Sequence, residues 1–309
     1  MISMKKVLVC NPIAEEGIKM MEDAGLQVDQ KFDMTPEELT ETIPSYHGVI
    51  VRSSTKLREP SIDAAINLEV IGRPGIGLDN VDAAYAREKG IAVYNTPTAT
   101  TISVAELAIA HMFTAYRNIV SGTISMRDGK WTKKELKSNE IYKKTLGLIG
   151  FGNIGQEVAR RARAMGMDIV YHTRNRREDA ETELDAKWLP LDDLLKTADF
   201  ISLHLPMTDQ TRGLIGEKEF SLMKESAVLV DTSRGGVVDE EALYDALKNN
   251  KIRFACKDVF AQEPPGKIPL LELDNFHATP HIGAQTMEGQ ERAGTQAAEK
   301  VIAELKKRG

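Results

Sequence analysis

Short runs of apolar residues alternate along the chain with longer helix-like stretches. A first series of apolar runs, between residues 6 and 95, comprises KVLVC, GVIVRS, LEVIGR and IAVYN. A second series, between residues 145 and 280, comprises TLGLIG, DIVYHT, FISLHLP, AVLVDTS, RFACKDVF and NFHATP. Near-continuous apolar strands separated by helices are typical of parallel sheets covered on both faces. The pattern therefore predicts an α/β protein with two parallel-sheet βα domains.

Helix signals fall between these runs. Thr35 can cap a helix whose first turn contains Pro36, and Glu38 completes a capping box. Residues 101–120 form an unusually long helical run between the two series, which predicts a hinge and a domain boundary there. The chain closes with a helical stretch over 286–309, rich in alanine and charge.

Composition fits an ordinary globular protein and excludes several classes. The 309 residues suit two domains, with 42% hydrophobic and 28% charged residues and a net charge of −6. Interspersed charges predict neither a nucleic acid nor a membrane as partner, and the brief apolar start favours a cytoplasmic protein. Cys10 and Cys256 lack metal-binding or disulfide spacing, so no metal is expected.

A glycine-rich loop follows the first strand of the second series. Gly150, Gly152 and Gly155 form GxGxxG between a strand and a helix, and a further strand follows. The glycines permit a tight turn and close approach of a pyrophosphate, which the helix N-terminus attracts. We predict a dinucleotide cradle that includes Asn153 and Ile154. The alternative is a glycine-rich turn that binds nothing.

The loop after the next strand bears on the choice of cofactor. An acidic residue there would bind both ribose hydroxyls, but the run is Thr173, Arg174, Asn175, Arg176 and Arg177. A hydroxyl and a guanidinium favour a 2′-phosphate, so NADP(H) is expected over NAD(H). Alternatively, this is a solvated basic loop in which Arg174 lies on the adenine.

Three residues that can do chemistry follow later strands. Arg234, Glu263 and His281 each come after the C-terminal end of a predicted parallel strand, where open α/β sheets bind ligands. Alone, each would be an ordinary loop residue. Together they supply an arginine for a carboxylate, a histidine for proton exchange and an acid to orient that histidine. Hydride transfer to or from a 2-hydroxy acid needs these groups.

The order of the motifs resembles that of the D-2-hydroxyacid dehydrogenase family over almost the whole chain. The matching segments are VRSSTKL, GRPGIGLDNVD, YNTPTATTISVAEL, KTLGLIGFGNIGQEVA, LHLPMTDQTRGLIG, MKESAVLVDTSRGGVVDEEAL, DVFAQEPP and TPHIGAQT. The resemblance, strongest to short phosphoglycerate dehydrogenases, implies catalytic roles for Arg234, Glu263 and His281. It also implies cofactor contacts at His204, Pro206, Thr232 and Asp258.

The resemblance also implies the domain plan. A Rossmann dinucleotide-binding domain, residues 98–283, would be inserted into a discontinuous flavodoxin-like substrate-binding domain made of residues 1–97 and 284–309. Members of the family are usually homodimers through the long helix and the arm after it, here near Trp131, and close a cleft on binding. A sequence of 309 residues has no room for the C-terminal regulatory domain of longer relatives, so neither that domain nor feedback by serine is expected.

The first domain carries the predicted substrate contacts, which face an anionic 2-hydroxy or 2-keto acid. These are Arg52, Ser53, Arg73, Gly75, Ile76 and Gly77. Two cations and several amides suit a second anionic group such as a phosphate, so D-3-phosphoglycerate and 3-phosphohydroxypyruvate, a pair of serine biosynthesis, are expected. Alternatively, the two arginines pair with acids at the domain boundary.

Two rival functions and one unexplained residue remain open at this point. Thr173 and Arg174 resemble NADPH-using glyoxylate and hydroxypyruvate reductases. Corepressors of the C-terminal-binding-protein type also resemble this family, and sense the dinucleotide instead of turning it over. Lys257 stands beside Asp258 where the strand usually carries an apolar residue, and the sequence offers no reason for it.

Overall fold

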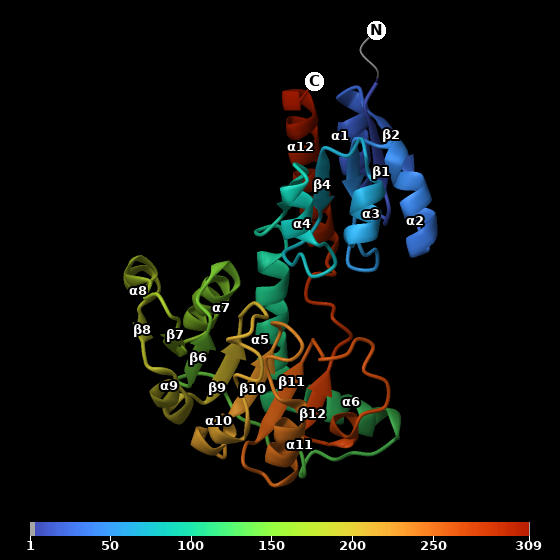
Figure 1. Ribbon diagram of the computed structural model, residues 1–309. Coiled ribbons are helices and arrows are strands. Elements are labelled where there is room, and N and C mark those ends of the chain that lie inside the picture. The colour runs from blue at the N-terminus through green and yellow to red at the C-terminus, as the bar shows by residue number, and fades with distance from the viewer. Residues whose placement is uncertain (1–3, 309) are drawn as a thin grey trace. The chain divides into compact units, whose positions relative to one another are not determined.

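The computed structural model describes residues 4–308 and forms two compact units, one of them built from both ends of the chain (Figure 1). The first unit comprises the described parts of Met1–Thr101 and Ala284–Gly309. The second unit is Ile102–Gly283. Each unit contains one parallel sheet, which confirms the predicted fold class.

The first unit is a five-stranded sheet in the order β2-β1-β3-β4-β5, with every neighbouring pair parallel. Its strands are β1 (Lys6–Val9), β2 (Gln27–Gln30), β3 (Gly48–Ile50), β4 (Val70–Arg73) and β5 (Ala92–Asn95). This order is the flavodoxin-like one, in which the chain reverses direction between β1 and β3. The loops after β3 and β4 therefore leave the same edge of the sheet side by side.

Helices cover both faces of this sheet. They are α1 (Glu15–Asp23), α2 (Pro36–Thr42), the 3₁₀ turn η1 (Ile43–Ser45), α3 (Glu59–Ala64), α4 (Ala83–Glu88) and α12 (Met287–Arg308). The predicted capping box of α2 is present, since Glu38 N–H donates to Thr35 Oγ1 and Thr35 N–H to Glu38 Oε2. The C-terminal α12 packs against α1, where a Cβ at Gly17 would lie 3.0 Å from the Gly294 carbonyl oxygen. Both chain ends are thus parts of one core.

The second unit is a seven-stranded parallel sheet in the order β12-β11-β10-β9-β6-β7-β8. Its strands are β6 (Thr145–Ile149), β7 (Asp168–His172), β8 (Ala186–Trp188), β9 (Phe200–Leu203), β10 (Val228–Asp231), β11 (Phe254–Lys257) and β12 (Phe276–Ala278). The order reverses between β6 and β9, as in a Rossmann fold. Ligands bind such sheets beyond the carboxyl ends of the strands at the point of reversal.

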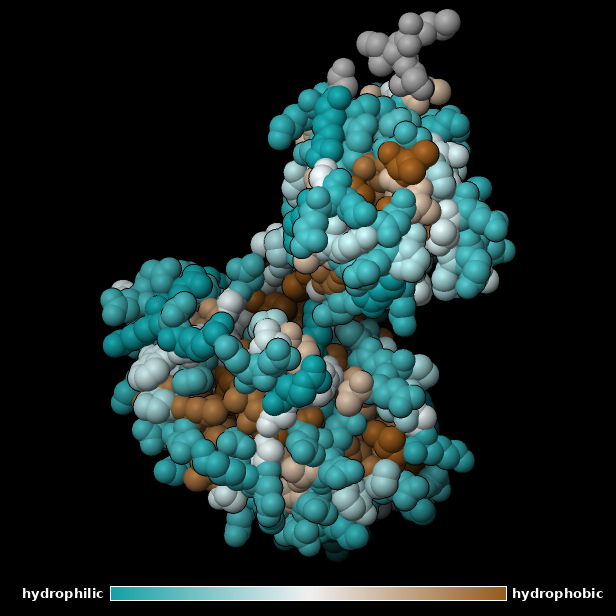
Figure 2. Space-filling view, viewed as in Figure 1, coloured by the Kyte–Doolittle hydropathy of each residue, from teal (hydrophilic) through white to brown (hydrophobic). Residues whose placement is uncertain are grey.

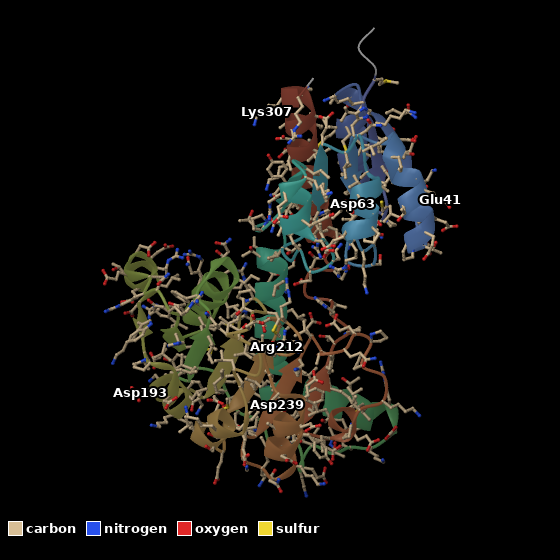
Figure 3. All side chains as sticks on the ribbon, viewed as in Figure 1. Glu41, Asp63, Asp193, Arg212, Asp239 and Lys307 are labelled. Atoms are coloured by element: carbon tan, nitrogen blue, oxygen red, sulfur yellow. The ribbon has the colours of Figure 1, made fainter. Side chains whose placement is uncertain are left out.

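Two hydrophobic cores lie on the two faces of this sheet. The helices are α5 (Thr101–Arg117), α6 (Ile119–Arg127), α7 (Asn153–Ala164), α8 (Glu178–Leu184), α9 (Leu191–Thr197), α10 (Glu217–Leu222), α11 (Glu240–Lys248) and the 3₁₀ turn η2 (Pro269–Glu272). Figure 3 labels Asp239, whose carboxylate caps α11 by accepting from Glu241 N–H and Ala242 N–H. Burial on both faces explains why these strands read as continuous apolar runs.

The sequence prediction was wrong in three places. Residues 101–120 are two helices, because Asn118 adopts a left-handed conformation with φ of 51° and separates α5 from α6. The edge strands β2 and β8 were not predicted. Their sequences, QVDQ and AKW, lack an apolar run because an edge strand is less completely covered.

The surface of each unit is mainly hydrophilic on the face drawn in Figure 2. Over residues 4–308, no helix is both long and apolar enough to cross a membrane.

Candidate active site

The glycine-rich loop joins β6 to α7 in a geometry that requires its glycines. Gly150 has φ of 95°, and a Cβ there would lie 2.3 Å from the His204 carbonyl oxygen. A Cβ at Gly155 would lie 2.4 Å from the Gly150 carbonyl oxygen, so this glycine lets α7 approach the strand. A Cβ at Gly152 would meet no atom within 4 Å, which leaves open space before the N-terminus of α7. The helix start can therefore receive an anionic group.

The other predicted cradle residues lie at the start of α7 and in the loop after β9. Asn153 is exposed at the first position of α7, and Ile154 packs against the core beneath. Pro206 is exposed after β9, and its carbonyl oxygen accepts from Thr211 Oγ1 at 2.7 Å. Figure 3 labels Arg212 in this loop.

Two predicted cofactor residues carry buried polar atoms without an internal hydrogen bond. Within the described chain, neither His204 Nδ1 nor Thr232 Oγ1 has a hydrogen-bond partner. Burial lowers the pKa of His204 to about 3, so its ring is neutral, and its Nε2 lies 2.9 Å from Ser202 Oγ. Buried polar atoms are rarely left without a partner. His204 follows β9, the neighbour of β6 in the sheet, and Thr232 follows β10, the strand beyond it, so a dinucleotide bound at the glycine-rich loop fits both.

The loop after β7 contains cations with different partners. Arg176 is held by Glu181, with Nε to Oε1 at 2.7 Å, and Arg177 Nε lies 3.7 Å from Asp179 Oδ1. Arg174 instead donates to the neutral amide of Gln210, at 2.5 Å. Its charge is therefore not offset by that partner. Thr173 Oγ1 donates to the Asn175 carbonyl oxygen at 2.7 Å, which shapes the turn.

The three predicted catalytic residues come from the loops after β10, β11 and β12, which are neighbours in the sheet. Glu263 Oε2 lies 2.7 Å from His281 Nδ1. Glu263 Oε1 accepts from Phe260 N–H at 3.0 Å, so both carboxylate oxygens are engaged. Both side chains are partly exposed to solvent, His281 by 47% and Glu263 by 37%. An acid thus orients a histidine whose other nitrogen, Nε2, is left for a substrate.

Asp258 holds the turn that carries His281. Its Oδ1 accepts from Thr279 Oγ1 at 2.6 Å and Ile282 N–H at 2.8 Å, and its Oδ2 accepts from Gly283 N–H at 2.7 Å. His281 itself has φ of 52°, which a bulky residue adopts only when its surroundings impose it. Asp258, which the resemblance predicts as a cofactor contact, therefore holds the turn that carries His281, and the sequence did not reveal this contact.

Arg234 lies in a loop fixed against its neighbour. Its Nη1 donates to the Ser233 carbonyl oxygen at 2.7 Å. A Cβ at the next residue, Gly235, would lie 1.7 Å from the Phe260 carbonyl oxygen. The loop of Arg234 and the loop of Glu263 are therefore in backbone contact, and only glycine fits at their junction.

The predicted substrate residues of the first unit follow β3 and β4. Arg52 Nη1 donates to the Pro12 carbonyl oxygen at 3.1 Å, and burial lowers the pKa of Arg52. Asn80 Nδ2 donates to the carbonyl oxygens of Arg52, at 2.9 Å, and of Thr55, at 2.7 Å. Asn80 thus holds the turn. Ser53 is exposed within it.

In the loop after β4, Arg73 folds over the glycine that follows. Its Nη1 donates to the Pro74 carbonyl oxygen at 3.0 Å, and a Cβ at Gly75 would lie 1.4 Å from that nitrogen. Gly75 N–H donates to Thr96 Oγ1 at 2.7 Å, so this amide is already used inside the unit. Ile76 and Gly77 are partly exposed beyond it.

Among residues 4–308, no group of three or more acidic, histidine or cysteine side chains is placed to hold a metal ion.

A Rossmann sheet with a glycine cradle and a histidine–glutamate pair is typical of nicotinamide-dependent oxidoreductases. Residues 109–283 match the family model "D-isomer specific 2-hydroxyacid dehydrogenase, NAD binding domain". The chain belongs to the D-isomer specific 2-hydroxyacid dehydrogenase family.

Three relatives illustrate this membership. The chain is 48% identical to D-3-phosphoglycerate dehydrogenase of Methanocaldococcus jannaschii over 96% of its own length, but spans only 57% of that protein. It is 46% identical to hydroxypyruvate reductase of Thermotoga maritima over 97% of this chain and 98% of the relative. The crystal structure of a protein from Thermus thermophilus is similar with a TM-score of 0.91 and 36% identity, covering 98% of this chain and 97% of that one.

Proposed function

We propose that this protein transfers a hydride between a nicotinamide dinucleotide and C2 of a D-2-hydroxy or 2-keto acid. The observation that carries the proposal is the 2.7 Å contact between Glu263 and His281, in the loop beside that of Arg234 on a Rossmann sheet. Family membership supports the reaction class. The bound nicotinamide supplies or accepts the hydride.

Each residue of the trio has one task in this proposal. Arg234 binds the substrate carboxylate and polarises the keto oxygen, because a guanidinium pairs with planar anions through two parallel hydrogen bonds. His281 gives its Nε2 proton to the C2 oxygen during reduction and takes it back during oxidation. Glu263 holds His281 by Nδ1 and stabilises its protonated form.

The domain roles follow from the same proposal. Residues 98–283 bind the dinucleotide, and residues 1–97 with 284–309 bind the substrate. The pyrophosphate is held by the glycines of the cradle with Asn153 and Ile154. The side chains of His204 and Thr232 form hydrogen bonds with the dinucleotide.

The preferred substrate pair is D-3-phosphoglycerate and 3-phosphohydroxypyruvate. Arg52 and Arg73 support it, because two guanidinium groups after neighbouring strands suit a substrate with a second anionic group. The name of the archaeal relative agrees. Reduction of hydroxypyruvate is the second candidate, favoured by a relative that matches this chain along nearly its whole length.

A substrate comparison separates these two candidates. We expect faster turnover of 3-phosphohydroxypyruvate than of hydroxypyruvate, measured as initial loss of nicotinamide absorbance. A substrate without the phosphate lacks the second anionic group that Arg52 and Arg73 would bind, and loss of such a contact typically costs an enzyme much of its kcat/KM. An equal or higher kcat/KM for hydroxypyruvate would make the protein a hydroxypyruvate reductase.

The cofactor proposed is NADP(H) in preference to NAD(H). Arg174 supports this, since its partner Gln210 is neutral while Arg176 and Arg177 are paired with acids. Arg174→Ala is expected to weaken NADPH binding by about tenfold or more, because a charge-assisted phosphate contact is lost. NADH binding should change little.

Titration of nicotinamide fluorescence measures both affinities. The matched control is Arg177→Ala, in the same loop but already paired with Asp179, which should leave NADPH affinity near that of the natural protein. An Arg174→Ala protein that binds both dinucleotides as before would remove Arg174 from the ribose-phosphate site.

The assembly proposed is a homodimer through α6 and the segment after it. Within one chain α6 buries no residue, and Ile124, Met126 and Trp131 are exposed by 53%, 58% and 78%. Apolar surface of this kind is typical of a protein interface.

Trp131→Asp is therefore expected to shift the protein from dimer to monomer at micromolar concentration, because a buried carboxylate without a partner opposes association. Sedimentation velocity measures the change. Ile66→Asp, at an apolar residue 79% exposed in the first unit, is the control and should remain dimeric. A monomeric natural protein, or a dimer unaffected by Trp131→Asp, contradicts this interface.

A further inference from the structure

The last residue of β11 is a lysine whose side chain is completely buried. Lys257 Nζ lies 3.4 Å from Asp231 Oδ2 and 3.4 Å from Glu240 Oε1, and 5.8 Å from the centre of the Phe260 ring. Asp231 is also completely buried. A buried ammonium is costly unless it is paired, so its position requires the two carboxylates. Both partners belong to segments next to predicted catalytic residues.

Asp231 anchors the loop that carries Arg234. It is the last residue of β10, and its Oδ1 accepts from Ser233 N–H at 3.1 Å and from Ser233 Oγ at 2.6 Å. Arg234 follows directly, and its side chain in turn donates to the Ser233 carbonyl oxygen. The orientation of the Asp231 carboxylate thus fixes the position of Ser233 and, through it, the backbone of Arg234.

Glu240 anchors the loop that carries Glu263. It begins α11, and its Oε1 accepts from Ala261 N–H at 2.9 Å. The residue before Ala261, Phe260, donates its N–H to Glu263 Oε1 at 3.0 Å. The same Glu240 oxygen therefore lies against both the buried ammonium and the loop that presents Glu263.

We infer that Lys257 is a positioning residue for catalysis, whose ammonium holds Asp231 and Glu240 together and so fixes the Arg234 loop against the Glu263 loop. The inference rests on the proposed function. Without the cation, two carboxylates face each other with one fully buried, and they relieve the repulsion by moving apart. Each carries its loop along, so Glu263 moves relative to His281.

Lys257→Met tests this role because methionine keeps an apolar stem of similar shape and removes the charge. We expect kcat to fall about 10- to 100-fold, since displacements of about 1 Å in a catalytic group cost up to that much. The affinity for reduced dinucleotide should fall less than kcat, because the glycine cradle lies on β6 and α7 and only Thr232 among the proposed dinucleotide contacts belongs to the displaced Arg234 loop. A change in KM or in dinucleotide affinity with kcat unchanged would overturn the role.

A spectroscopic signature reports the same contact without turnover. The Nδ1 proton that His281 shares with Glu263 gives a proton resonance in histidine-labelled protein, assigned by its disappearance in His281→Asn. The resonance should be lost or shifted in Lys257→Met. It should be unchanged in Lys224→Met, where the lysine removed pairs with Asp199 at 2.8 Å away from both loops.

A second variant tests the charge argument and guards against misfolding of the first. Glu240→Gln keeps an acceptor for Ala261 N–H but removes one of the two carboxylates. The double variant Lys257→Met with Glu240→Gln should regain part of the kcat lost in Lys257→Met, because the repulsion is smaller. If Lys257→Met does not fold, the double variant and Glu240→Gln alone are compared with Lys224→Met, and reduced kcat in both is expected.

The outcomes separate this inference from the proposed function. Full kcat and an unchanged His281 resonance in Lys257→Met, or losses in the double variant that simply multiply, would overturn the positioning role while the enzyme stays active. A natural protein that turns over no 2-keto acid, yet loses the resonance in Lys257→Met, would contradict the proposed function and leave the structural link intact.

Discussion

Replacing His281 with alanine is expected to lower kcat by about 10²- to 10⁴-fold, the usual contribution of a positioned acid or base. In the structure the ring is held at Nδ1 by Glu263 at 2.7 Å, which directs Nε2 toward a substrate. Dinucleotide affinity should remain near that of the natural protein, because the cradle is formed by the loop between β6 and α7. Steady-state rates and fluorescence titration measure the two quantities.

Glu263→Gln is a second, milder variant that tests the partner of His281. The amide can still accept from Phe260 N–H, but it brings no charge to stabilise a protonated His281, so a smaller loss of kcat is expected than for His281→Ala. His47→Gln, in the first unit, is the control and should retain full turnover. Near-normal kcat in His281→Ala would remove His281 from proton exchange.

Gly235→Ala is the second change with a large expected effect. Its Cβ would lie 1.7 Å from the Phe260 carbonyl oxygen and 2.8 Å from the Ala261 nitrogen, both of them backbone atoms. The loops of Arg234 and Glu263 must therefore separate, and a displacement of about 1 Å at these groups costs up to 100-fold in kcat. The unfolding temperature should also fall, since overpacking typically costs about 1–3 kcal/mol.

Gly216→Ala is the matched control for this prediction. A Cβ there would meet its nearest atoms at 3.7 Å, an ordinary van der Waals contact, so kcat should not change. Kinetics and thermal unfolding of both variants make the comparison. Wild-type kcat in Gly235→Ala would show that the two loops need not be in contact for catalysis.

Most of the fold follows from apolar periodicity because ten of its strands lie in apolar runs separated by helices. The edge strands β2 and β8 escape this reasoning because QVDQ and AKW carry polar residues where a central strand would be apolar. Apolar periodicity also does not predict the break between α5 and α6 at Asn118. An asparagine tolerates the left-handed conformation, but nothing in the periodic pattern of 101–120 requires it there.

The sequence predicts those parts of the candidate site that depend on local signals, and it does not predict contacts between distant segments. Glycine spacing and residues placed after strands are local signals, so the sequence predicts the cradle and the trio of Arg234, Glu263 and His281, whose loops follow neighbouring strands in the structure. Lys257 looked unexplained because its partners Asp231 and Glu240 are brought to it by strand order and by the start of α11.

Direct transfer of hydride by the natural protein is the central claim, and isotope transfer tests it most directly. The protein is incubated with NADPH or NADH deuterated at C4 and with 3-phosphohydroxypyruvate or hydroxypyruvate, and the 2-hydroxy acid formed is analysed by mass and chirality. We expect a D product that carries deuterium at C2. An unlabelled product, an L product, or no product with either acid and either dinucleotide would contradict it.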